Sequence, residues 1–84
     1  MAVAQSHILT TAISEFLGSA PTLEEIIAFK LPEALEERGL ELLARNRNGE
    51  LTPEERAELD EFTYMGHFMN LVKLKARLNL AGQA

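Results

Sequence analysis

The segment from Ala44 to Glu55 has the spacing of an EF-hand calcium loop and is the first place where this chain could do chemistry. Gly49 would be the sixth residue of such a loop, and Glu55 would supply the carboxylate at its twelfth position. The first position requires an Asp ligand, but it is Ala44, and Arg45 and Arg47 add positive charge beside it. Helix caps explain Gly49 and Glu55 equally well, so the sequence predicts no metal site here.

Other catalytic residue types lack the neighbours that catalysis needs. His7 and His67 have no His or Glu three or four residues away, which is the spacing of a helical metal site. The chain has no cysteine, its serines lack a strand–turn–helix setting, and no glycine-rich phosphate loop is present. We therefore expect neither enzyme activity nor a cofactor.

Composition limits the partners that the chain could bind. Its 84 residues suffice for a single domain over residues 1–84, and a domain of this size buries a small share of its surface. Without cysteine it has no disulfide, so association with another chain is a remaining source of stability. The net charge of −5 argues against general affinity for nucleic acid. No segment is long and apolar enough to span a membrane, and the N-terminus lacks the pattern of a secretory signal, which favours a cytoplasmic protein.

The N-terminal part of the chain contains two short helical patterns. Apolar residues recur at helical spacing over Ile8–Leu17, although residues 1–20 could also form a strand or a frayed arm. A capping box that starts at Thr22 predicts a short helix over residues 22–30.

The C-terminal part contains two longer patterns, over residues 32–48 and 52–80. A proline stands in the first turn of each, and the second also starts with a capping box. Gly49 is expected to be the left-handed cap between them, while Gly39 and Gly66 would mark a bend or a close contact. The short connection predicts an antiparallel hairpin, and the whole pattern predicts an all-α protein of three or four helices built around it. The helix over residues 32–48 is expected to turn an apolar stripe inward: Ala34, Leu35, Leu40, Leu42 and Leu43.

The last helix has more apolar surface than the rest of the chain can cover. At about 100° per residue, one side is formed by Phe62, Met65, Phe68, Met69, Val72, Ala76 and Leu80, and a second, roughly opposite, by Tyr64, Leu71, Leu74 and Leu78. A helix that is apolar nearly all round is normally buried on several sides. A partner is therefore expected, either a second copy or another protein. We assign its contacts to Tyr64, Phe68, Leu71, Leu74 and Leu78, with Lys75 at the rim.

The same helix carries the alternative to this hypothesis. Every acidic residue lies between Glu15 and Glu61, and the chain from Phe62 onward carries cations at Lys73, Lys75 and Arg77. Cations are favourable near a helix C-terminus. They could also form a basic strip, which leaves a small DNA-binding regulator as the alternative function.

The segment LLARNRNGELTPEERAELDEFTYMGHFMNLVKLKARLNL resembles a group of small bacterial proteins that are frequent in cyanobacteria and planctomycetes. The shared pattern is an Asn/Gly turn, then Leu-Thr-Pro-Glu-Glu-Arg-Ala-Glu over residues 51–58, then an aromatic-rich helix that ends in Lys-Ala-Arg over residues 75–77. The resemblance covers residues 24–80, and the chain departs from it at Gly39 and Gly66. It brings no catalytic residues. It implies an antitoxin-like or accessory binding role beside an HNH nuclease or a toxin.

These patterns together predict a non-enzymatic protein-binding module that self-associates or covers a partner protein, such as the nuclease or toxin of an antitoxin-like pair. Helix-in-groove burial by the last helix would be the mechanism. A structural subunit of a larger complex would have the same sequence features.

Overall fold

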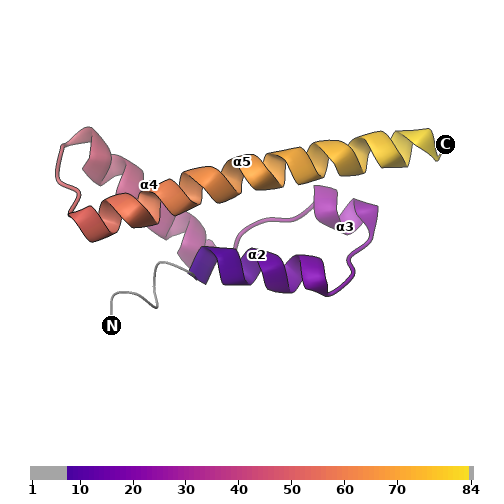
Figure 1. Ribbon diagram of the computed structural model, residues 1–84, viewed down its shortest axis with the longest axis horizontal. Coiled ribbons are helices and arrows are strands. Elements are labelled where there is room, and N and C mark those ends of the chain that lie inside the picture. The colour runs from indigo at the N-terminus through magenta and orange to yellow at the C-terminus, as the bar shows by residue number, and fades with distance from the viewer. Residues whose placement is uncertain (1–7, 84) are drawn as a thin grey trace.

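The computed structural model describes residues 8–83, which form four helices and no strand (Figure 1). This confirms the all-α class expected from the sequence. The helices are α2 (Ile8–Gly18), α3 (Leu23–Ile27), α4 (Glu33–Arg47) and α5 (Pro53–Gly82). Helix α5 runs along the whole molecule, with α2 and α3 beneath it and α4 against its N-terminal part (Figure 1). His7 and the rest of the possible N-terminal arm, residues 1–7, lie outside the described residues.

Both capping boxes form as the sequence predicts. At the start of α3, the Thr22 hydroxyl accepts a hydrogen bond from the Glu25 N–H at 3.1 Å, and the Glu25 carboxylate accepts one from the Thr22 N–H at 2.8 Å. Thr52 and Glu55 form the same two bonds at the start of α5, each 3.1 Å long. Each box satisfies amide groups that a helix N-terminus otherwise leaves without partners.

The N-terminal helix belongs to the core. Leu9 and Ile13 of α2 are buried together with Met65 and Met69 of α5, and partly buried side chains from α2, α4, α5 and the connection after α3 surround them. Phe29 packs on Phe16 of α2, with ring centroids 4.5 Å apart. The chain leaves the helical path to place Phe29 there, so α3 ends at Ile27 and not near residue 30 as expected.

The hairpin of α4 and α5 turns at Gly49, which has the left-handed conformation expected of it, with φ of 70°. The N–H of Glu50 donates to the Arg45 carbonyl at 2.9 Å, and the N–H of Gly49 donates to the Asn46 carbonyl at 3.1 Å. These two bonds are the Schellman motif, in which a left-handed residue ends a helix. The turn sends α5 back along α4, and α5 continues to Gly82, two residues beyond the expected end.

The two glycines in helix interiors, Gly39 of α4 and Gly66 of α5, have different surroundings. A Cβ atom on Gly39 would lie 3.1 Å from two ring carbons of Phe62, so α4 and α5 approach closely at this position. A Cβ atom on Gly66 would meet nothing within 4 Å, and α5 continues through this residue unbroken (Figure 1). The expectation of a bend or a close contact at Gly66 is therefore wrong.

The predicted inner stripe of α4 is only partly correct. Leu42 is fully buried and Leu35 is half-buried, but three members of the stripe are exposed: Ala34, Leu40 and Leu43. The reason is that Arg38 and Arg45, which share a side with Leu42, turn toward carboxylates of α5. This rotation carries Leu40 and Leu43 out of the space between the helices.

Candidate functional site

The outer face of α5 is formed by the five apolar side chains that the sequence assigns to a partner. The structure leaves all five exposed: Tyr64 by 71%, Phe68 by 38%, Leu71 by 59%, Leu74 by 49% and Leu78 by 61%. The helical repeat places most of them opposite the buried residues of the same helix. That a partner covers this outer face stays a prediction.

The opposite side of α5 is the inner face, which packs on the molecule's own helices. Met65, Met69 and Ala76 are buried, and Phe62, Val72 and Leu80 are half-buried. Phe68 belongs to both predicted sets, and its 38% exposure places it at the border between the two faces.

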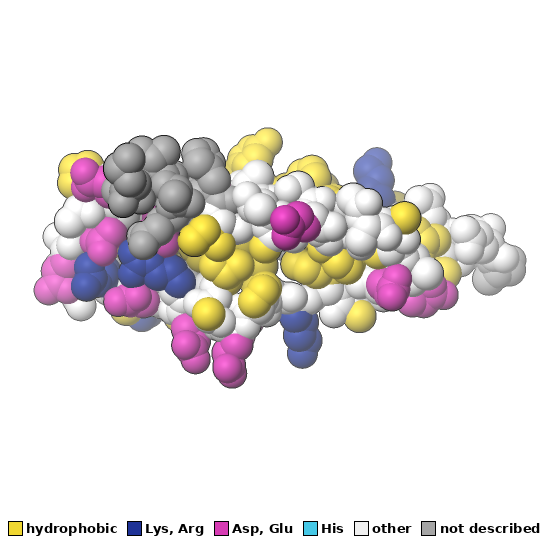
Figure 2. All heavy atoms as spheres, turned by 90° about the horizontal axis from the view of Figure 1, so that it is seen from below, with side chains coloured by type: hydrophobic (Ala, Val, Ile, Leu, Met, Phe, Trp, Pro, Cys, Tyr) yellow, Lys and Arg dark blue, Asp and Glu magenta, His cyan; other side chains and the backbone are white. Residues whose placement is uncertain are grey.

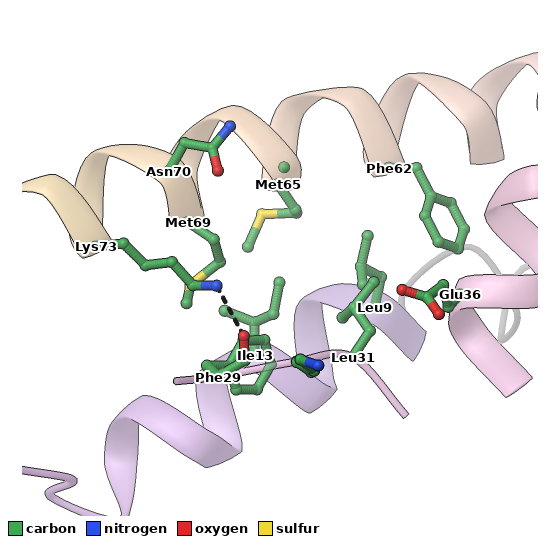
Figure 3. A pocket seen from close by; sticks show the side chains of 12 residues that line it. Leu9, Ile13, Phe29, Leu31, Glu36, Phe62, Met65, Met69, Asn70 and Lys73 are labelled. Atoms are coloured by element: carbon green, nitrogen blue, oxygen red, sulfur yellow. Dashed lines mark hydrogen bonds between the residues drawn. The ribbon is translucent and has the colours of Figure 1, made fainter. Parts of the chain in front are cut away.

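Lys73, Lys75 and Arg77, the cations in the C-terminal half of α5, do not all lie on one side of the helix. Residues two positions apart on a helix point about 200° away from each other, so Lys73 and Lys75 lie on different sides. The Lys73 ammonium donates a hydrogen bond to the Phe29 carbonyl at 2.7 Å (Figure 3). Lys75 and Arg77 are exposed and form no ion pair with any residue from 8 to 83. This geometry leaves two separated charges beside the outer face, and the DNA-binding alternative stays a prediction.

At the hairpin end, charged side chains pair within the chain. The Arg38 guanidinium donates to both carboxylate oxygens of Glu58, at 2.8 and 2.9 Å, and to Glu41 at 2.8 Å. Hydrogen bonds to Glu58 and then to Glu41 raise the pKa of Arg38 above its usual value. A planar guanidinium that binds a carboxylate through two parallel bonds fixes the orientation of both helices.

Glu55 has a complete structural role in the segment that resembles a calcium loop. Its carboxylate accepts the Thr52 N–H and pairs with Arg45. The hydrogen bond from Thr52 lowers the pKa of Glu55, and the charges of Arg45 and Arg38 lower it further. Among residues 8–83, no three His, Asp or Glu side chains lie close enough to hold a metal ion. The absence of a metal, a cofactor and enzyme activity stays a prediction.

A pocket of about 360 Å³ lies between α2, the connection after α3 and α5 (Figure 3). Its walls include the core residues Leu9, Ile13, Met65 and Met69, and Lys73 lies at its edge. The Lys73 ammonium is held by a backbone carbonyl across the pocket. Ligand sites usually combine apolar walls with a few polar groups that converge on the ligand. Lys30, Glu36 and Asn70 also line this pocket, and the Lys73 ammonium at its edge already has a partner within the chain.

A second apolar surface lies between α4 and α5, and sequence reasoning missed it. Leu40 and Leu43 are 62% and 48% exposed and border a shallow groove of about 260 Å³ that reaches Leu59 and Phe62. The helical pattern of α4 suggested that both leucines point inward. The signal that could have found the groove is Arg38 and Arg45 on the side of Leu42, where they compete for the inner position.

Viewed from the side of α2 and α3, charged side chains are densest at one end of the molecule, and a few more lie along the rest of this face (Figure 2). Lys, Arg, Asp and Glu side chains gather at the hairpin end, whereas hydrophobic side chains occupy the middle of this face. No helix of the described chain is long and apolar enough to cross a membrane.

Comparison with protein-family models, with curated proteins and with solved structures finds no match to this chain. The resemblance to small bacterial proteins therefore stays a prediction, and the argument about function depends on the surface of the molecule.

Proposed function

We propose that this chain is a non-enzymatic protein-binding module that uses the outer face of α5 to associate with a second copy or to cover another protein. The observation that carries the proposal is the exposure of four large apolar side chains, from 49% to 71%, on one side of one helix. Scattered apolar side chains are common on surfaces, but a contiguous group is typical of an interaction site.

The outer face would bind by helix-in-groove burial. Tyr64, Leu71 and Leu78 recur every two turns, so they would enter a groove in a single row. Tyr64 adds a hydroxyl that can bond at the rim, and aromatic side chains are enriched where binding energy is concentrated. Lys75 beside this row supplies a charged rim.

Two further expectations from the sequence, one about the kind of partner and one about the compartment, are part of this proposal. The resemblance described above supports an antitoxin-like partner of a nuclease or toxin. The absence of cysteine from the chain supports a reducing compartment such as the cytoplasm.

The test compares two pairs of exposed leucines in the same molecule. Leu71 and Leu74 are 59% and 49% exposed on the outer face, and Leu40 and Leu43 are 62% and 48% exposed on α4. Both pairs have the same spacing on a helix, so Leu71→Glu/Leu74→Glu and Leu40→Glu/Leu43→Glu are matched variants. Light scattering behind a sizing column would give the mass of each variant over a range of concentrations, with helicity checked by circular dichroism.

We expect the Leu71/Leu74 variant to lose association and the Leu40/Leu43 variant to keep it, while both remain helical. If the wild-type chain is a monomer, each variant would be used to capture partners from cells that make the protein. A partner lost only with the Leu71/Leu74 variant would then support the proposal. Association that survives in that variant, or that disappears only in the Leu40/Leu43 variant, would show that the outer face is not the binding site.

A further inference from the structure

The outer face of α5 contains a seven-residue repeat that suits pairing with another long helix. Tyr64, Leu71 and Leu78 occupy one position of the repeat, and a second position three residues on is formed by His67, Leu74 and Ala81. Apolar residues at these two positions form the contact line of two-stranded coiled coils. We call these six residues the heptad seam. All six are exposed.

The rest of the molecule leaves the heptad seam accessible. The positions farthest from the seam are Phe62, Met69 and Ala76, which are half-buried or buried against the molecule's own core. A second helix could therefore lie along the seam without displacing α2, α3 or α4. The exposed length is large, because α5 has 30 residues, or about 45 Å at 1.5 Å per residue.

Charge is distributed unevenly along α5. Residues 53–68 contain one arginine and five acidic residues, of which Glu55 and Glu58 already pair with arginines of α4, whereas residues 69–82 contain two lysines, one arginine and no acid. Two copies side by side in parallel would place like charges together at both ends. Two antiparallel copies would place the acidic half of each beside the basic half of the other, and complementary charge sets orientation and register.

From this pattern we propose that the partner of the outer face is a second copy of this chain, bound as an antiparallel coiled coil along the heptad seam. This inference rests on the proposed function, because it names the partner of the same surface. The register with nearly full overlap of the two helices is centred at Met69. In it, Tyr64 of one copy faces Leu74 of the other, and His67 faces Leu71. The same register places Asp60, the residue seven before His67 at the second repeat position, opposite Leu78 of the other copy and therefore beside its Arg77.

Two residues at different distances from the centre, one and ten positions after Met69, supply a direct test of orientation. Asn70 and Asn79 are both exposed on α5, and the chain has no cysteine of its own, so Asn70→Cys and Asn79→Cys each give one site for a nitroxide spin label. In the antiparallel dimer, the two copies of residue 70 differ by about 3 Å along the helix axis and those of residue 79 by about 30 Å. In a parallel dimer, both pairs would be level with each other.

Pulsed electron-paramagnetic-resonance distances would distinguish these arrangements. We expect a short distance for labels at residue 70 and one longer by roughly 20 Å or more for labels at residue 79. Equally short distances at both sites would overturn the antiparallel arrangement. An intermediate distance at residue 79 would overturn the register centred at Met69.

Charge reversal gives an independent test. Arg77→Glu should weaken the dimer by about tenfold or more, because it places a carboxylate beside Asp60 of the other copy at two symmetric sites. Adding Asp60→Lys to the same chain should restore most of the affinity, and the restored dimer should weaken in high salt as the wild type does. In a parallel dimer Arg77 would not lie beside Asp60 of the other copy, so adding Asp60→Lys to Arg77→Glu would restore no affinity, and that result would overturn the antiparallel arrangement.

These experiments also separate the inference from the proposed function. A mass of one chain at every concentration would overturn the second-copy inference, even if another protein binds the outer face and is lost with Leu71→Glu/Leu74→Glu. A dimer that persists with those two substitutions would overturn both, because the outer face would then not be the contact.

Discussion

The two ends of α5 are surrounded differently by the rest of the chain. At the hairpin end, Arg38 and Arg45 of α4 pair with Glu58 and Glu55 of α5, and Leu42 beside them is fully buried. Toward the other end, Leu71 and Leu78 are about 60% exposed. Lys75 and Arg77 there have no carboxylate partner among residues 8–83.

The difference follows from the length of the helix that packs against each end of α5. Helix α4 offers 15 residues to the hairpin end, whereas α3 offers five residues to the C-terminal half. A helix of about one and a half turns can cover only one side of α5. The chain therefore completes its charge pairs at the hairpin end, where Leu40 and Leu43 of α4 nevertheless stay exposed, and leaves Leu71, Leu74 and Leu78 of α5 exposed toward the other end. This comparison is the physical basis for placing the binding surface on the outer face.

The largest effect is expected when two leucines that are adjacent in sequence but differ in burial are each replaced by alanine. Leu42→Ala should lower the free energy of unfolding by about 2–5 kcal/mol, because it removes a fully buried side chain and leaves a cavity. Leu43→Ala should change it by about 0.5 kcal/mol or less, because Leu43 is 48% exposed. Urea unfolding followed by circular dichroism would measure both.

Leu43 is the control for Leu42, since the two share residue type, helix and neighbourhood. Comparable losses in the two variants would mean that the hairpin end is not packed more tightly than the exposed surface, and the comparison between the two ends would fail. A large loss at Leu43 alone would show that the groove on α4 is covered in solution.

Alanine substitutions at two glycines inside helices, Gly39 in α4 and Gly66 in α5, compare a close contact between helices with an open surface. Gly66→Ala should stabilise the protein by about 0.5–1 kcal/mol, because alanine favours helix and the added Cβ meets no atom within 4 Å. Gly39→Ala should stabilise it less, because the added Cβ lies 3.1 Å from the Phe62 ring, which must move. The difference between the two melting temperatures measures the closeness of α4 and α5. A larger gain for Gly39→Ala would contradict the close approach.

Local chemistry made the helix starts predictable. Thr22 and Thr52 each stand three residues before a glutamate, and this spacing alone fixes two hydrogen bonds that the structure contains. Gly49 ends α4 in the left-handed conformation for an equally local reason. The exposure of the second apolar side of α5 was also predictable, because few other residues are available to cover it.

Features that depend on how helices rotate against each other do not follow from apolar periodicity alone. Apolar periodicity shows which residues of α4 share a side, but it does not show that Arg38 and Arg45 take the side toward α5. Leu40 and Leu43 were misplaced for this reason. The early end of α3 has a similar cause, because it depends on the contact between Phe16 and Phe29, which are far apart in sequence.

The smallest expected effect is a change with pH at the hairpin end. Hydrogen bonding to Thr52 and the charges of Arg45 and Arg38 hold the pKa of Glu55 below its ordinary value of 4.5 in the folded chain. The stability that this carboxylate contributes is therefore fully present above about pH 4.5 and is lost as the pH falls through the lower folded value. Glu55→Gln, which keeps the acceptor for Thr52 but cannot ionise, should lower stability at pH 7 and reduce its loss between pH 5 and 3. Urea unfolding across this range would measure the slope, and Glu50→Gln removes the same formal charge outside the cap. An equal change of slope in both variants would assign the effect to net charge and would remove Glu55 from the interactions that complete the hairpin end.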